Sequence, residues 1–214
     1  MDRERNGRNV SILIVDDHPV VRTGLTTLLE KQPGLQVGGA VESGEEALAF
    51  LDGGRIEVVL LDLRMPKKSG LEILPEILRC KNPPKVLILS SYDLEEEVYR
   101  VAQSGAAGYL TKNSSGQQIA EAIFAVASGK TYFPENIVER LAEREGRPAL
   151  SPREQDVLLM VSKGLTNKEI AHTLQLSQFT VRNHIIHIME KLEVGSRTEA
   201  VAIAIQLGLV TMHS

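Results

Sequence analysis

The sequence contains no tryptophan, one cysteine and few aromatic residues. Aromatic residues make up 4% of the 214 residues, and Cys80 has no second cysteine with which to form an internal disulfide. Although 43% of the residues are hydrophobic, no apolar run approaches the ~20 residues of a membrane span. The start, MDRERNGRNV, is charged and leads into no secretory-type apolar segment. We therefore expect a soluble protein of a reducing compartment, the cytoplasm, with no membrane contact.

The chain also lacks an excess of basic residues. Its formal net charge is -4 at pH 7. Residues 1–147 hold 18 Lys and Arg against 22 Asp and Glu, and residues 148–214 hold 6 against 6. Neither part has the strongly basic body of a constitutive nucleic-acid binder, so any DNA contact must come from locally placed charges.

Short apolar runs alternate with segments of helical period over residues 11–128. The runs are SILIV (11–15), LQVGGAV (35–41), VVLLD (58–62), KVLILS (85–90) and GYLT (108–111). The predicted helix starts are Pro19, Ser43, Ser69, Asp93 and Ser114, with a capping box between Ser43 and Glu46. This alternation predicts an α/β domain over residues 10–130, a flavodoxin-like (βα)5 fold with a parallel sheet in the order 2-1-3-4-5.

From about Gly129 only helical signals remain. A helix around Glu135 to Arg144 and a charged segment with Gly and Pro form a predicted helical linker, residues 131–147. Helix starts follow at Ser151, Thr166, Ser177 and Ser196, with capping boxes at the first, second and fourth. They predict a small all-α four-helix domain over residues 148–212. Within it, the helix 166–174, the turn 175–176 and the helix from 177 to about 192 have helix-turn-helix spacing.

Carboxylates end two of the predicted strands. Asp16 and Asp17 follow the first strand and Asp62 the third, and in a 2-1-3-4-5 sheet these strands are neighbours that flank the ligand-binding crevice. Three carboxylates this close favour a bound divalent cation such as Mg²⁺. Ser90 and Lys112 end the fourth and fifth strands at the same edge. An aspartate beside Mg²⁺ and lysine can accept a phosphoryl group, so we infer that chemistry.

Plainer interpretations of these residues exist. An aspartate at a strand end is often a helix cap, and a lone lysine is often a solvated charge. The convergence of five such residues on one edge favours a functional pocket. A Mg²⁺-dependent phosphohydrolase would share the carboxylates, but Arg64 stands where a second acid would be expected two residues after Asp62. A module that is never phosphorylated and serves only protein interaction is a further alternative.

The segments DDHP (16–19), DLRMP (62–66), SS (90–91) and GYLTK (108–112) resemble the receiver domain of two-component response regulators. The resemblance covers roughly residues 10–130. It implies that Asp62 is phosphorylated by a histidine kinase or a small phosphodonor. It implies Mg²⁺ (or Mn²⁺) ligands from Asp16, Asp17, Asp62 and the Arg64 backbone carbonyl. It also implies that Lys112 pairs with the phosphoryl group, that Ser90 moves to bond it and that Tyr109 swings inward behind Ser90.

One position departs from that family. Asn113 follows Lys112 where many receivers have a proline. Because a cis peptide bond before a residue other than proline costs ~2.5–4 kcal/mol, we expect this bond to be trans.

The helix from Ser177 has a plausible DNA-reading face. Val181, Ile185, Ile188 and Leu192 recur at helical spacing and face the core, which leaves Asn183, Ile186, His187 and Glu190 on the opposite face. Arginine can read guanine, asparagine adenine, and an exposed isoleucine a thymine methyl. The predicted DNA contacts are Lys168, Ser177, Thr180, Arg182, Asn183, Ile186, His187 and Lys191, with Lys168, Thr180 and Lys191 on phosphates. A polar surface helix of an interaction domain would look similar.

The LuxR/GerE-type domain of NarL/FixJ-type regulators is resembled over residues 148–212 by the segments LSPREQDVL, GLTNKEIA, LSQFTVRNHI, KL and SRTEAV. The resemblance makes the helix from Ser177 the recognition helix, and Ile186 departs from the small polar or basic residue that is common there. The family also pairs the last helix across a dimer. We expect Val201, Ala204 and Ile205 at such a contact, with core burial as the alternative.

Together these features predict a phosphorylation-switched transcription regulator rather than an enzyme, apart from Mg²⁺-dependent autophosphorylation and autodephosphorylation. Its expected partners are a sensor histidine kinase, a second copy of the chain on phosphorylation, and DNA with two half-sites in inverted repeat.

Overall fold

The structure, a computed structural model, describes residues 9–145 and 148–210. The chain divides into two compact units, and along the sequence the main division falls between Val138 and Glu139, inside the predicted linker. Three predicted segments lie wholly or partly outside the described residues: the charged start (residues 1–8), residues 146–147 of the linker, and residues 211–212 of the second domain.

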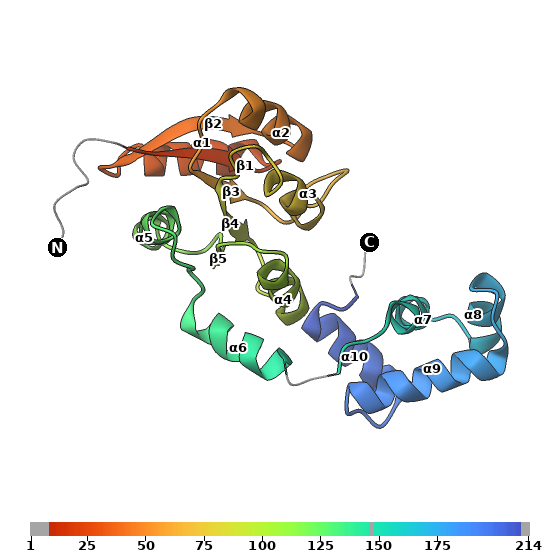
Figure 1. The fold of residues 1–214 in the computed structure, drawn as a ribbon. Helices are drawn as coiled ribbons and strands as arrows, with labels where there is room; N and C mark the ends of the chain where they lie inside the picture. The colour runs from red at the N-terminus through yellow and green to blue at the C-terminus, as the bar shows by residue number, and fades with distance from the viewer. Residues whose placement is uncertain (1–8, 146–147, 211–214) are drawn as a thin grey trace. The chain divides into compact units, whose positions relative to one another are not determined.

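Five parallel strands form the sheet of the first unit (Figure 1). They are β1 (Val10–Val15), β2 (Leu35–Val41), β3 (Val58–Leu61), β4 (Lys85–Ser90) and β5 (Gly108–Thr111). Their order is β2-β1-β3-β4-β5, which confirms the prediction. β3 is buried over its whole length, because a central parallel strand has both faces covered. The order reverses between β1 and β3, and the last residues of these two strands, Val15 and Leu61, pair with each other.

Helices cover both faces of this sheet. They are α1 (Pro19–Leu29), α2 (Gly44–Gly53), α3 (Gly70–Ile77), α4 (Glu95–Gln103) and α5 (Gly116–Ala127). Leu29 of α1 and Ile123 of α5 belong to one buried cluster with Ile12, Leu60 and Leu87 of the sheet. In Figure 1, α5 lies on one side of the sheet, and α3 and α4 lie on the other.

Two helix starts differ from their predicted positions. α5 is capped by Ser115 rather than Ser114, because the Ser115 hydroxyl is the one that accepts from the Gln118 N–H. α4 begins at Glu95, two residues after the predicted cap Asp93. Three consecutive glutamates occupy its first turn, where negative charge is favourable beside the helix N-terminus.

Two predicted capping boxes are only half formed. Ser43 and Ser196 accept from the N–H groups of Glu46 and Glu199 as expected, but each glutamate carboxylate accepts from the residue before the serine. These serines have φ angles of -144° and -146°, whereas Ser69, whose box is complete, has φ -67°. The more extended backbone turns the serine N–H away from the helix, so the carboxylate meets the preceding N–H instead.

The chain after α5 returns to the edge of the sheet. Tyr132 forms a parallel bridge with Gly108, its N–H donates to the Ala107 carbonyl at 2.9 Å, and its carbonyl accepts from the Tyr109 N–H at 3.0 Å. A Cβ atom at Gly108 would lie 2.4 Å from the Tyr132 carbonyl oxygen. Only glycine therefore allows this close approach, which ties the beginning of the predicted linker to β5.

The part of the chain beyond Tyr132 is helical. Its helices are α6 (Glu135–Glu145), α7 (Pro152–Ser162), α8 (Asn167–Thr173), α9 (Gln178–Lys191) and α10 (Arg197–Leu207). The last four pack around the buried cluster of the second unit, which includes Val157, Ile170, Val181, Ile188 and Ala200. Within the described part of the chain, no helix combines the length and the apolar character that crossing a membrane requires.

A largely buried ion pair joins the start of α7 to the end of α9. Glu154 completes the capping box of α7 by accepting from the Ser151 N–H at 2.6 Å, and its carboxylate lies 2.7 Å from the Lys191 Nζ. The Glu154 side chain is only 5% exposed. Lys191 also donates to the Ala149 carbonyl at 3.1 Å. The Lys191 ammonium group is thus engaged within its own unit, with 29% of the side chain exposed, and its DNA phosphate contact stays a prediction.

The close contact at Gly108 gives a first prediction. Replacing Gly108 with Ala should lower the free energy of unfolding of the first unit by about 1–3 kcal/mol, because the Tyr132 segment or β5 must shift. Urea denaturation of the full chain measures this. Gly24→Ala is the matched control, since a Cβ atom there meets nothing within 4 Å inside a helix and should be neutral or stabilising. Equal stability of the Gly108→Ala variant and the unsubstituted protein would contradict the argument.

The Glu154–Lys191 pair gives a second prediction. Burial raises the pKa of Glu154, but the hydrogen bonds from Lys191 and Ser151 and the Lys191 charge outweigh it, so the net pKa lies below its usual 4.5. A lowered carboxylate pKa stabilises the fold above about 4.5, and this stability is lost as the pH falls through the folded-state value.

We therefore expect Lys191→Met to destabilise the second unit by about 1–3 kcal/mol at neutral pH and to flatten the stability loss on acidification. Urea unfolding of the full chain at a series of pH values measures both effects. Lys163→Met, at an exposed lysine that follows α7, is the control. An unchanged pH profile in Lys191→Met would show that the pair is not responsible.

Candidate functional sites

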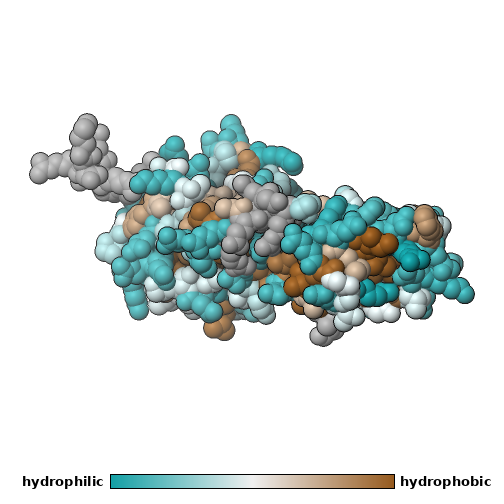
Figure 2. All heavy atoms as spheres, turned by 90° about the horizontal axis from the view of Figure 1, so that it is seen from below, coloured by the Kyte–Doolittle hydropathy of each residue, from teal (hydrophilic) through white to brown (hydrophobic). Residues whose placement is uncertain are grey.

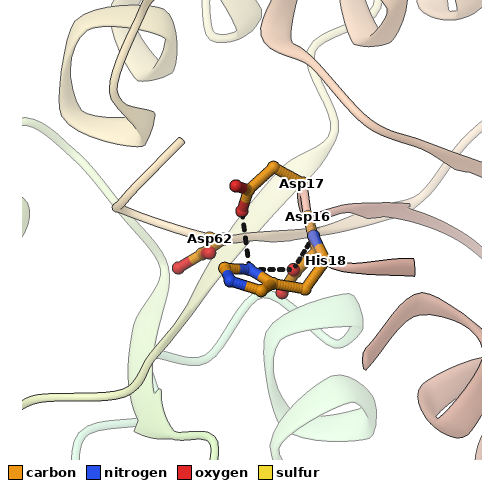
Figure 3. Close-up of side chains that lie close together, drawn as sticks. All are labelled: Asp16, Asp17, His18 and Asp62. Atoms are coloured by element: carbon orange, nitrogen blue, oxygen red, sulfur yellow. Dashed lines mark hydrogen bonds and ion pairs between the residues drawn. The ribbon is translucent and has the colours of Figure 1, made fainter. Parts of the chain in front are cut away.

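Asp16 and Asp62 lie side by side where the strand order reverses (Figure 3). Asp16 follows β1 and Asp62 follows β3, and the pairing of Val15 with Leu61 places both carboxylates in one crevice. Their residues are 2% and 3% exposed. With Asp17 and His18 they form a group whose potential ligand atoms all lie within 4.8 Å of one another. The structure thus brings together the three carboxylates that the sequence singled out.

Lys112 enters the same crevice from the end of β5. Its Nζ lies 2.6 Å from Asp16 Oδ2 and 2.7 Å from Asp62 Oδ2, and its side chain is 14% exposed. The ammonium group therefore bridges two buried carboxylates that would otherwise repel each other. The peptide bond from Lys112 to Asn113 is trans, as expected, and so are the other described peptide bonds.

Burial and the neighbouring charges together shift the pKa values of two groups in the crevice upward. Burial raises the pKa of Asp62 most, and the Asp16 charge adds to this, while the hydrogen bond and charge of Lys112 lower it without cancelling the rise. Burial lowers the pKa of Lys112, but its hydrogen bonds and charge interactions with both carboxylates produce a net rise. The Lys112 ammonium group alone neutralises part of the charge of Asp16 and Asp62, with Asp17 nearby. An additional cation in the crevice would therefore be electrostatically favourable.

The donor atoms of the crevice fit a small, hard divalent cation. Asp17 Oδ1 is buried and accepts no hydrogen bond from the described part of the chain, although His18 Nδ1, which carries charge only when protonated, lies 2.8 Å away. A buried carboxylate oxygen without a donor is a candidate metal ligand. Mg²⁺ takes oxygen ligands and typically uses one or two carboxylates together with water. Asp16, Asp17 and Asp62 match that requirement.

A second layer of contacts surrounds Asp62. The Arg64 N–H donates to Asp62 Oδ1 at 3.3 Å, and the Arg64 guanidinium lies 4.4 Å from the centroid of the Tyr92 ring. The Ser90 hydroxyl, which is fully buried, accepts weakly from the Tyr92 N–H at 3.4 Å. Tyr109 is also fully buried, and its hydroxyl donates to the Tyr92 carbonyl. Tyr109 therefore already occupies an inward position in this structure.

Arg22 is a contributor to the pocket that the sequence reasoning missed. From α1, its guanidinium donates to the Asp16 backbone carbonyl at 2.6 Å, and it lies 3.7 Å from the Glu42 carboxylate that follows β2. The Arg22 side chain is 17% exposed. It thus fixes the backbone between Asp16 and Asp17. The sequence signal for this contact was an arginine six residues after Asp16, on a helix that begins at Pro19 between the two residues.

α8 and α9 form the predicted helix-turn-helix. Val181 and Ile188 of α9 are buried, and Ile185 and Leu192 pack partly buried against the same core, as the periodicity predicted. Ser177 caps α9, because its hydroxyl accepts from the Thr180 N–H at 3.0 Å. The two hydroxyl groups of Ser177 and Thr180 lie 2.8 Å apart.

The outward face of α9 presents the residues predicted to contact bases. Arg182 and His187 are exposed, Asn183 is partly exposed and Ile186 is 42% exposed. Lys168 on α8 is exposed as well. These side chains remain available to a ligand, whereas the Lys191 ammonium group is already engaged by Glu154.

The predicted dimer residues of α10 divide into two groups. Ile205 is 36% exposed and Val201 is partly buried. Ala204, in contrast, is completely buried in the core of its own unit, so our expectation of a partner contact there is corrected. The reason is geometric, since Ala200 and Ala204 lie one turn apart on the side of α10 that faces the core.

Comparisons with known proteins agree with this geometry. The model of the response regulator receiver domain matches residues 12–124, and that of the luxR family of bacterial regulatory proteins matches residues 148–204. Response regulator protein VraR of Staphylococcus aureus is 34% identical over 206 residues, which cover 94% of this chain and 99% of VraR.

Solved structures of full-length regulators also match. The response regulator ChrA of a heme-sensing two-component system gives a TM-score of 0.54 at 32% identity, covering 94% of this chain and 99% of ChrA. RcsB of Salmonella typhimurium gives a TM-score of 0.71 at 25% identity, covering 91% and 98%. This chain is accordingly a two-component response regulator, with a receiver domain followed by a LuxR-type helix-turn-helix DNA-binding domain.

Proposed function

We propose that Asp62 is the phosphoacceptor of this regulator and that its phosphorylation controls DNA binding by the second domain. The observation that carries the proposal is the bridge of Lys112 between Asp16 and Asp62 at the crevice between β1 and β3. Asp62 is the carboxylate that follows the central strand β3, and the Lys112 ammonium is placed to pair with a phosphoryl group attached to it.

The proposed reaction transfers a phosphoryl group from a phosphohistidine of a sensor kinase. An Asp62 carboxylate oxygen attacks phosphorus, a P–O bond forms, the P–N bond breaks, and the leaving imidazole nitrogen takes up a proton. Asp16, Asp17, Asp62 and the Arg64 carbonyl would hold Mg²⁺ or Mn²⁺. When bound, the ion supplies positive charge against the phosphoryl oxygens.

Water can hydrolyse the acyl phosphate by attacking phosphorus, which breaks the P–O bond to Asp62 and releases inorganic phosphate. Slow autodephosphorylation therefore belongs to the proposal, as does autophosphorylation from a small phosphodonor. Sustained hydrolysis of phosphate esters is less favoured. Arg64, which stacks on Tyr92, stands where a general acid would be needed two residues after Asp62. Because an arginine stays protonated, it cannot donate a proton to a leaving group.

The switch that we propose runs through Ser90 and Tyr109. The Ser90 hydroxyl lies at the end of β4 and would donate to a phosphoryl oxygen, which pulls on the segment that contains Tyr92. Tyr109 bonds to Tyr92 through its hydroxyl and to Tyr132 through its backbone N–H. A change at Ser90 therefore reaches the beginning of the predicted linker through hydrogen bonds within the receiver.

The proposed output is sequence-specific DNA binding by a dimer. Ser177, Thr180 and Lys168 would position α9 on phosphates, and Arg182, Asn183, Ile186 and His187 would contact base edges. Val201 and Ile205 would contribute to pairing of two copies on an inverted repeat. Structures of RcsB include dimers bound to DNA and a promoter complex with a beryllofluoride phosphomimetic, which supports this assignment by similarity.

Phosphorylation is tested by incubating the full chain with acetyl phosphate and Mg²⁺. We expect labelling of the unsubstituted protein and its loss in Asp62→Asn, because an amide is not a nucleophile toward phosphorus. Intact-mass spectrometry measures the labelled fraction. Asp52→Asn, at an exposed aspartate that ends α2, is the control and should label normally. Persistent labelling of Asp62→Asn would remove the assignment.

DNA binding is tested with duplexes selected from a random pool, measured at several salt concentrations with and without beryllofluoride. Lys168→Ala should weaken binding to all duplexes and reduce the salt slope by about 1, whereas Arg182→Ala should cost about 1–3 kcal/mol at one base position. Lys31→Ala in the receiver serves as the control. If beryllofluoride changes neither self-association nor affinity, the proposed switch is wrong.

A further inference from the structure

Phe179 leaves most of an aromatic side chain in solvent. It is the second residue of α9, in the helix's first turn, and it is 72% exposed. It is the most exposed large hydrophobic residue described in the second unit, ahead of Ile186 at 42% and Ile205 at 36%. Figure 2 shows hydrophobic surface on this unit among hydrophilic residues.

Phe179 and Ile186 point in nearly the same direction. At ~100° per residue, seven residues bring the helix back to within about 20° of its starting direction. Val181 and Ile188, which are buried, keep the opposite side of α9 in the core. The two apolar side chains therefore stand in line on the outward face, about 10.5 Å apart along the helix axis.

Polar and basic residues surround this apolar pair. Asn183 lies between Phe179 and Ile186 on the same face, the exposed Arg182 lies beside it, and the exposed Lys168 stands on α8. A ligand that is complementary to these side chains must offer negative charge, hydrogen-bonding groups and isolated apolar groups. The major groove of DNA offers all three, since the C5-methyl group of thymine is its apolar feature.

We infer that Phe179 is a specificity-determining residue that contacts a thymine methyl group in the major groove, with Ile186 contacting a second one. This inference rests on the proposed DNA-binding function and adds a base preference to it. Because base pairs rise ~3.4 Å, the two thymines should lie no more than about three base pairs apart. Residues in the first turn of a recognition helix are the ones that reach base edges.

The test replaces thymine by deoxyuridine, which lacks only the methyl group. Duplexes selected from a random pool by the full chain with beryllofluoride and Mg²⁺ are resynthesised with one deoxyuridine at a time. The unsubstituted protein should bind about fourfold more weakly at each of two positions, the factor expected for one buried methyl group. In Phe179→Ala, replacing thymine by deoxyuridine at one of these positions should not weaken binding further. In Ile186→Ala, the same should hold at the other position.

Val138→Ala, an exposed apolar residue of α6, is the control and should show both losses unchanged. Deoxyuridine losses that are the same in Phe179→Ala as in the unsubstituted protein would overturn the inference while DNA binding stands. A Phe179→Ala variant with altered sedimentation in the absence of DNA and unaltered base preference would assign the residue to a protein interface instead. Failure of the unsubstituted protein to enrich any duplex would remove the proposed function itself.

Discussion

The parallel pairing of β1 with β3 is the constraint on which the receiver pocket depends. Since Val15 pairs with Leu61, the next residue of each chain segment, Asp16 and Asp62, leaves the sheet at the same place. Two carboxylates that are almost fully buried there would repel each other strongly in the absence of a cation. Lys112 from β5 supplies that charge and Arg22 from α1 fixes the backbone of Asp16. The repulsion between buried like charges is the physical reason why we propose that the crevice binds a metal ion and a phosphoryl group.

The same sheet also connects the pocket to the beginning of the linker. β4 ends at Ser90 and β5 carries Tyr109, whose hydroxyl and N–H groups bond in two directions, to Tyr92 and to Tyr132. Gly108 makes this second bond possible because a side chain at its position would collide with the Tyr132 carbonyl. In the switch that we propose, this close-packed edge would carry small movements of the pocket to the beginning of the linker, because tightly packed groups cannot move independently.

The second unit divides the surface of α9 between two tasks. Its inward face holds the small core together through Val181 and Ile188, and its end is anchored by the Lys191–Glu154 ion pair. Because these contacts fix the helix on one side, the outward face is free to carry residues that do nothing for stability, including Phe179 and Ile186. Exposed apolar side chains are costly in water, and under the proposed base contacts a DNA groove that covers Phe179 and Ile186 would offset this cost.

The strand order, the helix-turn-helix spacing and the three carboxylates with Lys112 could be predicted from the sequence, because they follow from local periodicity, capping residues and strand ends. The pairing of Lys191 with Glu154 was not foreseen, and Ala204, expected at a dimer contact, is buried in the core of its own unit. The contact of Arg22 with the Asp16 carbonyl was missed as well. These features required the folded structure, because the partner of a charge and the burial of a small residue depend on segments distant in the sequence.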